Sequence, residues 1–401
     1  YDGPTSISRA ALLAASTDAA PQRNVVMLPL QARTQGSLAR MAVQWLSYAK
    51  SPLNLLEQQS LSGTVEAYAR LRANQPQPQR AVVMVEDKTQ LIEALEVIAA
   101  GKSASKYIVG GKVPGGLDTP PKVGIVFAGQ GPQWPEMGRQ FYATSPIFRG
   151  IIDQCDAAYA KISENGQTFT AATGLFLPGA TVTVSMDDTW VAQPALYMHA
   201  MGLYTMMTAT TQLDAHCVLG HSMGEVAAAV AAGYLSLEGG MQLAYLRGKM
   251  QSSLKGSGRL LAMNVSAEEA LRVAQDAGLP TGAVEVAAYN APTSITLAGK
   301  EVDLKRIQAH VEEAGLGLMA TLVRGNTAFH SKAMEPIAEA FTTACQGLLK
   351  KSKVTSATGQ RMMVSTVTGQ AVTTGLTADH WWQNIRGSVR FQEAMEGAVN
   401  L

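Results

Sequence analysis

The chain has few cysteines and few aromatic residues, and neither sign of charge is in excess. Its 401 residues include three cysteines, 6% aromatic residues, and 32 Lys plus Arg against 31 Asp plus Glu. Cys155, Cys217 and Cys345 are far apart and form no C-x-x-C pair, so neither a disulfide framework nor a zinc site is indicated. The balanced charge also supplies no basic field that would attract nucleic acid.

Long apolar runs and a basic-then-apolar N-terminal signal are also missing from the sequence. We therefore expect no membrane partner, and the sparse cysteines favour a reducing, cytoplasmic compartment. Apolar residues make up 47% of the chain, which suits a real core, and the length predicts two or three domains. Because the sequence starts at Tyr1 rather than Met, we expect a piece of a longer protein or a processed product.

The first hundred residues predict a small αβ unit. Residues 1–22 are polar and are expected to be extended, whereas residues 110–122 are rich in Gly and Pro and resemble a linker. Between them, apolar spacing and helix-stop signals predict two strands and three helices. The strands are expected at 23–30 and 80–86, and the helices at 37–50, 55–72 and 87–101.

A second domain is predicted to open with the strand and glycine turn VGIVFAGQG at Val123. Strands and helices then alternate to about residue 256, which favours a parallel sheet covered by helices. From Gly258 the order becomes β-α-β-β-α-β, the ferredoxin-like arrangement. The expected fold is thus α/β, with an α/β-hydrolase-like core (122–257 and 325–401), an inserted ferredoxin-like subdomain (258–324) and a preceding αβ domain (1–121).

One stretch of this second domain has the spacing of a nucleophile elbow. Residues 218–233 read VLGHSMGEVAAAVAAG, in which Ser222 lies between Gly220 and Gly224. In G-x-S-x-G elbows the serine sits on a sharp strand-to-helix turn, and the helix N–H groups can stabilise an oxyanion. The alternative is a glycine-rich turn in which Ser222 only caps the helix.

A serine nucleophile needs a base, and six histidines are available. His330, in GNTAFHSKAM, follows the last predicted strand of the insertion and can face a cleft where the chain re-enters the main domain. We expect the side chain of His221 to point away from the Ser222 hydroxyl, and His380 to be packed or exposed. A packed or capping histidine is the alternative for His330.

Five short motifs occur in one order: FAGQGPQW, GHSMGE, AYLRGKM with Arg247, TAFHS and WWQNIRGSVRF. Together they resemble the malonyl-type acyltransferase family, above all the acyltransferase domains of polyketide synthases and fatty-acid megasynthases. The resemblance covers about residues 122–401. The first 121 residues resemble the linker domain between ketosynthase and acyltransferase in those enzymes, which implies an adjacent ketosynthase in a longer chain.

The resemblance implies a Ser-His dyad. Ser222 would attack the thioester of an acyl-coenzyme A, and His330 would accept its proton. Backbone N–H groups of Gln130 and Met223 would form the oxyanion hole. Arg247 would hold the free carboxylate of a malonyl-type group, as a planar guanidinium does well. Asn384 matches the position whose backbone carbonyl orients the histidine.

The residues before the histidine indicate the acyl group. In the family a phenylalanine directly before this histidine accompanies malonyl, and Phe329 would fill the space of an α-methyl. Met223 points the same way, whereas Thr327 departs from the usual malonyl pattern. Gln193 and Asn290 match family positions that line the site. One methyl is worth only about 1–3 kcal/mol of discrimination, so methylmalonyl-CoA remains a possible second substrate.

The expected function is loading of a malonyl-type unit from coenzyme A onto the phosphopantetheine thiol of an acyl carrier protein, without metal or redox cofactor. An α/β-hydrolase acting as esterase or thioesterase is the alternative enzyme, although that family gives an arginine no role in the acyl pocket. A scaffold fragment that only docks carrier proteins is the non-enzymatic alternative.

Overall fold

A computed structural model describes residues 25–51, 60–72, 77–102, 105–112, 122–163, 165–211, 213–351 and 361–401. The extended segment expected at 1–22 and most of the linker expected at 110–122 lie outside these residues. The chain divides into two compact units, one within Ala20–Lys122 and one within Val123–Leu401.

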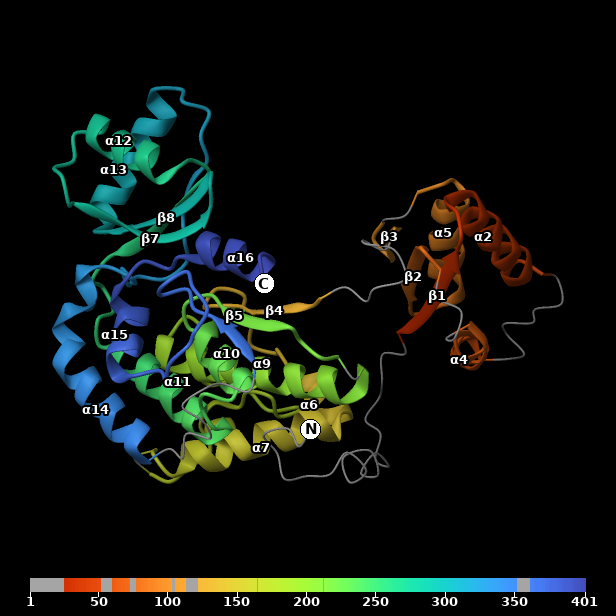
Figure 1. Cartoon of the computed structure of the whole chain (residues 1–401), viewed down its shortest axis with the longest axis horizontal. Helices are drawn as coiled ribbons and strands as arrows, with labels where there is room; N and C mark the ends of the chain where they lie inside the picture. Colours follow the sequence, from red (N-terminus) through yellow and green to blue (C-terminus); the bar gives the residue numbers. More distant parts are fainter. Residues whose placement is uncertain are drawn as a thin grey trace. The chain divides into compact units, whose positions relative to one another are not determined.

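The first unit is a three-stranded antiparallel sheet with helices, so it is a small αβ unit as predicted, with a third strand that the sequence analysis missed (Figure 1). Burial alternates along β1, so that Leu28 and Leu30 enter the core. Helix α5 begins where the side chain of Asp87 accepts a hydrogen bond from the backbone N–H of Gln90 at 2.8 Å. The elements are β1 (Val26–Ala32), α2 (Gln35–Ala49), α4 (Leu61–Arg72), β2 (Gln79–Val85), α5 (Lys88–Ala99) and β3 (Ile108–Lys112).

The linker prediction was wrong at its start, because β3 extends into the glycine pair of residues 110–111. Gly110 pairs with Ala81 of β2, and a Cβ atom there would lie 2.7 Å from the backbone oxygen of Arg80. The glycine therefore permits two strand backbones to approach closely rather than marking a loop.

The second unit has a parallel sheet in the order β10-β5-β4, covered by helices, as predicted. Its strands are β4 (Gly124–Phe127), β5 (Cys217–Gly220) and β10 (Met362–Val364). Its helices are α6 (Arg139–Thr144), α7 (Pro146–Ala160), α8 (Phe169–Thr173), α9 (Thr189–Thr211), α10 (Gly224–Ala232), α11 (Leu237–Ser252), η1 (Lys332–Ile337), α14 (Ala338–Lys351), α15 (Ala378–Arg386) and α16 (Phe391–Val399).

The inserted subdomain has the ferredoxin-like topology that the sequence predicted. Its four antiparallel strands lie in the order β7-β8-β6-β9, and its two helices bury their apolar faces against that sheet (Figure 1). The elements are β6 (Arg259–Met263), α12 (Ala267–Asp276), β7 (Val284–Ala291), β8 (Ser294–Gly299), α13 (Glu301–Glu313) and β9 (Ala320–Leu322).

The segment before α16 fastens this subdomain to the parallel sheet. The backbone N–H of Val389 donates to the carbonyl of Ala287 at 2.8 Å, and its carbonyl accepts from Tyr289 at 2.9 Å. Helix α16 then packs against β5 and β10 through Ala394. The subdomain edge is therefore held next to the parallel sheet.

Candidate active site

The carboxyl ends of the three parallel strands meet at one edge of the sheet, and the candidate site lies there. Strand β4 runs into the glycine turn at Gly129–Gly131, β5 runs into Ser222, and β10 runs into Ser365 and Thr366. Segments far apart in the sequence thus converge on the serine.

Ser222 occupies a strained turn between β5 and α10, with φ of 52°. Gly220 and Gly224, on either side of Ser222, lie so close to neighbouring backbone atoms that neither position has room for a side chain. A Cβ on Gly220 would lie 2.1 Å from the carbonyl carbon of Gly224, and one on Gly224 would lie 2.2 Å from the carbonyl oxygen of Phe127. The local geometry is that of a nucleophile elbow, and Ser222 precedes α10 without capping it through its side chain.

His330 lies within hydrogen-bond distance of this serine. The Nε2 atom of His330 is 2.7 Å from the Oγ of Ser222, and its Nδ1 is 3.0 Å from the carbonyl oxygen of Gly387. Because a carbonyl only accepts, Nδ1 carries the proton and Nε2 presents its lone pair to the serine hydroxyl. The arrangement can therefore act as a nucleophile and base.

The electrostatic surroundings keep the imidazole neutral. Burial, followed by the positive charge of Arg247 and the influence of His221, lowers the pKa of His330 to about 3. His330 itself has φ of 57°, so both members of the pair sit in the left-handed region. A neutral base is thus available at any pH near neutrality.

The predicted role of Asn384 in orienting the histidine was wrong. The carbonyl that accepts from His330 belongs to Gly387, three residues later in the same motif. Asn384 instead donates from Nδ2 to the backbone oxygen of Ser222 at 3.2 Å, and its Oδ1 accepts from Nη1 of Arg247. Helix α15 ends at Arg386, so the Gly387 carbonyl is free to turn toward the histidine.

Two backbone N–H groups, those of Gln130 and Met223, lie on the two turns for which the sequence predicted an oxyanion hole. The glycine turn and the elbow are in contact, because a Cβ on Gly129 would lie 2.7 Å from the carbonyl oxygen of His221. Within the described part of the chain, the backbone N–H groups of Gln130 and Met223 donate to no protein atom. Both groups are thus available to a ligand oxygen.

Arg247, on α11, is fully buried near the Ser222–His330 pair. Its Nε donates to Oε1 of Gln193 at 3.3 Å, and its Nη1 donates to Asn384. Its Nη2 is enclosed and finds no partner among the described residues. Burial lowers the pKa of Arg247 to about 10, opposed by the negative charge of Glu225, so the guanidinium stays charged at neutral pH. A buried, incompletely paired guanidinium is suited to an incoming carboxylate.

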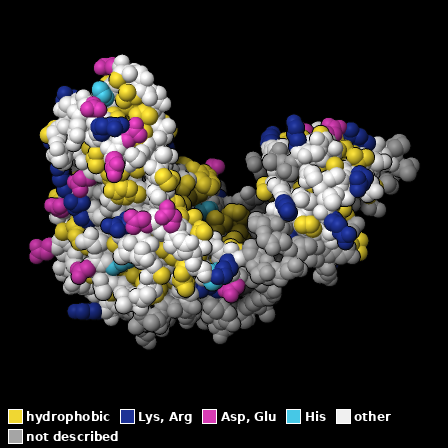
Figure 2. All heavy atoms as spheres, turned by 45° about the horizontal axis from the view of Figure 1, so that its top comes forward, with side chains coloured by type: hydrophobic (Ala, Val, Ile, Leu, Met, Phe, Trp, Pro, Cys, Tyr) yellow, Lys and Arg dark blue, Asp and Glu magenta, His cyan; other side chains and the backbone are white. Residues whose placement is uncertain are grey.

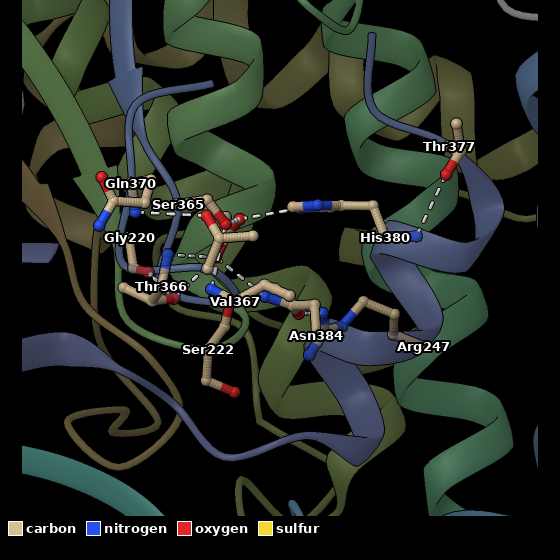
Figure 3. A network of polar contacts seen from close by, with 12 residues as sticks. Gly220, Ser222, Arg247, Ser365, Thr366, Val367, Gln370, Thr377, His380 and Asn384 are labelled. Carbon is tan, nitrogen blue, oxygen red and sulfur yellow. Dashed lines mark hydrogen bonds and ion pairs between the residues drawn. The ribbon is translucent and has the colours of Figure 1, made fainter. Parts of the chain in front are cut away.

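Glu225 and His380 are parts of this site that sequence reasoning missed. The buried carboxylate of Glu225 accepts from Ser365 and Thr366 hydroxyls at 2.7 Å, from Nε2 of His380 at 2.9 Å and from Asn384 at 3.1 Å. Figure 3 shows Asn384 between Ser222 and Arg247 in this network. The only sequence signal was the Glu that closes GHSMGE, since a charged residue starting an alanine-rich buried helix needs partners.

The four residues predicted to form the specificity pocket lie in different surroundings. Gln193 is buried beside Arg247, and Thr327 is also buried. Phe329 is partly buried and packs against the main core. Asn290, on β7, accepts at Oδ1 from Nε2 of His221 at 2.9 Å. Asn290 therefore bonds the residue before the nucleophile, and the His221 side chain points away from Ser222 as expected.

Across the described residues, no cluster of three or more His, Cys, Asp or Glu side chains could hold a metal ion. None of the helices described is both long and apolar enough to cross a bilayer. Figure 2 shows acidic and basic side chains interspersed over the visible face of the larger unit.

Comparison with known proteins gives consistent matches. The acyl transferase domain family model matches residues 125–400. Polyketide synthase GfsA of Streptomyces halstedii is 33% identical over 319 residues, which are 79% of this chain and 4% of that protein. Erythronolide synthase EryA3 of Saccharopolyspora erythraea is 29% identical over 372 residues, covering 93% of this chain and 11% of that protein. The chain thus spans only a small part of these relatives.

Solved structures agree with the family match. The acyltransferase domain from module 8 of the salinomycin polyketide synthase is similar with a TM-score of 0.76 and 26% identity, covering 94% of this chain and 82% of that one. MCAT from Streptococcus pneumoniae shares the fold, with a TM-score of 0.57 and 24% identity, and the match covers 69% of this chain and 84% of that one. Because the family model matches residues 125–400, more than half of the 401-residue chain, the chain belongs to the acyl transferase domain family.

Proposed function

We propose that this acyltransferase domain transfers a malonyl-type unit from coenzyme A to the phosphopantetheine thiol of an acyl carrier protein, within a polyketide synthase. The observation that carries the proposal is the Ser222–His330 contact of 2.7 Å beside a buried arginine with one unpaired nitrogen. A nucleophile and base suit a thioester, and the arginine suits a substrate with a free carboxylate. The similarity to polyketide synthases over most of this chain supports its place in such a synthase.

In the first half-reaction, the Oγ of Ser222 attacks the thioester carbon while its proton moves to Nε2 of His330. The oxyanion that forms is stabilised by the N–H groups of Gln130 and Met223. The C–S bond then breaks, and the departing coenzyme A thiolate takes the proton from His330. The product is a seryl ester, and Nε2 is again unprotonated.

In the second half-reaction, the carrier thiol gives its proton to Nε2 of His330 and attacks the seryl ester. Collapse of the tetrahedral intermediate breaks the bond to the Oγ of Ser222, which recovers the proton from His330. Gly387 keeps Nδ1 protonated in both halves, so Nε2 remains the working nitrogen. Throughout, the carboxylate of the acyl group is held by Arg247.

We further infer a preference for malonyl over methylmalonyl. The Phe329 ring, one residue before the base, limits the space for an α-substituent. Buried Thr327 lies two residues before Phe329, and buried Met223 follows the nucleophile in the elbow. Gln193 supports Arg247 at 3.3 Å, and Asn290 holds His221. The unit within Ala20–Lys122 is proposed to be the linker domain that joins an adjacent ketosynthase.

Intact mass spectrometry tests the proposal. Incubation with malonyl-CoA should give a long-lived malonyl adduct that Ser222→Ala removes, and added carrier protein should discharge it. An α/β-hydrolase would release malonate without a lasting adduct, and a docking scaffold would give neither adduct nor release. Either result would refute the transferase assignment.

A further inference from the structure

The charge of Arg247 is balanced in an unusual way. Among the described residues no carboxylate forms an ion pair with it, although it is fully buried. Its Nη1 bonds instead to the neutral amide of Asn384. Isolating a charge in a protein interior is unfavourable, so a negative group must lie nearby.

That negative group is Glu225, one residue further along the network. Asn384 donates from Nδ2 to Oε2 of Glu225 at 3.1 Å while its Oδ1 accepts from Arg247 (Figure 3). A guanidinium can only donate, and a carboxylate can only accept. The amide therefore satisfies both neighbours in a single orientation, and Glu225, by accepting from the amide nitrogen, fixes the amide oxygen toward the arginine.

The remaining partners of Glu225 hold it in place. Ser365, Thr366 and His380 donate to its two oxygens at 2.7–2.9 Å, and the backbone N–H of Thr366 adds a contact at 3.1 Å. With its acceptor sites filled, the carboxylate is fixed behind Asn384. Its charge acts on Arg247 through space without occupying the guanidinium fork.

A direct Glu–Arg ion pair would use the donors that a substrate carboxylate needs. The interposed amide keeps the balancing charge close and leaves Nη2 of Arg247 unpaired. We infer that Asn384, held by Glu225, is a positioning residue that keeps Arg247 open to the acyl carboxylate and so determines the preference for carboxylated acyl groups. This inference rests on the proposed function.

The test measures Ser222 acylation by malonyl-CoA and by acetyl-CoA in the full 401-residue chain. The ratio of the two kcat/KM values is the readout, because Asn384 also bonds the carbonyl of Ser222 and its loss can slow both reactions. Wild type must first prefer malonyl, and Arg247→Ala must lower that preference; failure here rejects the proposed function itself.

Given that result, Asn384→Ala should lower the malonyl-to-acetyl ratio at least tenfold, mainly through KM for malonyl-CoA. The matched control is Asn264→Ala, which removes an asparagine that accepts a backbone hydrogen bond at 2.6 Å in the ferredoxin-like subdomain. The control should keep the wild-type ratio. An unchanged ratio in Asn384→Ala would overturn the inference, even if both rates fall.

Exchanging the two polar groups gives a sharper test. Asn384→Asp places two carboxylates together and should lower the thermal midpoint, whereas the double variant Glu225→Gln/Asn384→Asp restores one donor–acceptor pair between the two side chains and removes the repulsion. The double variant should regain stability over Asn384→Asp yet keep a ratio at least tenfold below wild type, because the carboxylate introduced on α15 then pairs directly with Arg247. A ratio within twofold of wild type would overturn the inference. Should the double variant not fold, Asn384→Ala decides alone.

Discussion

Acylation of Ser222 should resist acid far better than a reaction that depends on an ordinary histidine. The pKa of His330 is lowered to about 3, first by burial and then by Arg247 and His221. At pH 5, a histidine with the usual pKa of about 6.5 is only about 3% neutral, whereas one with a pKa of about 3 is about 99% neutral. The structure therefore predicts almost constant kcat/KM from pH 8 to pH 5, where an exposed base would lose about thirtyfold.

The assay is the pH dependence of kcat/KM for coenzyme A release, since this parameter reports groups of the free enzyme. Malonyl-CoA and acetyl-CoA are compared, because acetyl-CoA has no acyl carboxyl group whose titration could imitate that of the base. Circular dichroism at each pH shows whether the fold persists.

A tenfold or larger decline centred near pH 6.5, with the fold intact and for both substrates, would refute the reasoning. Arg247→Ala provides an internal check with acetyl-CoA. It removes the second cause of the low pKa and leaves the first, burial, in place. The acid limb should move to higher pH in this variant and remain below pH 6.5.

Three further predictions concern selectivity and stability. Arg247→Ala should abolish the preference for carboxylated acyl groups in competition between malonyl-CoA and acetyl-CoA, and persistent malonyl preference would exclude the clamp. Phe329→Ser should raise methylmalonyl loading relative to malonyl by about tenfold, within the range of one methyl group; an unchanged product ratio in intact masses would place the size limit elsewhere. The pKa of His330 is lower in the folded state than in the unfolded state. Between about pH 6.5 and pH 3 the imidazole is therefore protonated in the unfolded state and neutral in the folded state. The free energy of unfolding consequently falls as the solution is acidified through this range. Between pH 8 and pH 5 the wild type should lose about 2 kcal/mol more than His330→Gln in urea unfolding, and parallel curves would contradict the buried neutral histidine.

The features that sequence could predict are those set by neighbouring residues along the chain. The order of strands and helices from Gly258 to Val323 predicted the ferredoxin-like subdomain, because apolar periodicity and glycine stops are local signals. The elbow was accessible through its G-x-S-x-G spacing, and Gly220 is needed by backbone contacts within the turn itself, whereas Gly224 is needed by its contact with Phe127 at the end of β4.

Features that depend on a distant partner were missed or misplaced. Gly110 looked like part of a linker. The reason for a glycine at this position is its close contact with the backbone of Arg80, which is 30 residues away in sequence. Asn384 was assigned to His330, but helix α15 directs its amide to Arg247 and leaves the carbonyl of Gly387 for the histidine. The role of Glu225 could not be predicted, because its partners follow β10 and lie on α15.

The strained backbone at the reactive pair links these observations. Among the described residues, only Phe176, Ser222 and His330 are non-glycine residues with positive φ. Such conformations cost about 1–3 kcal/mol each and persist only where surrounding contacts fix them. At Ser222 the contacts include the Asn384 amide on its carbonyl oxygen, and at His330 the Gly387 carbonyl on its imidazole. Asn384 thus supports the strained nucleophile and the guanidinium together, so one short segment, from Asn384 to Gly387, contacts all three reactive side-chain positions.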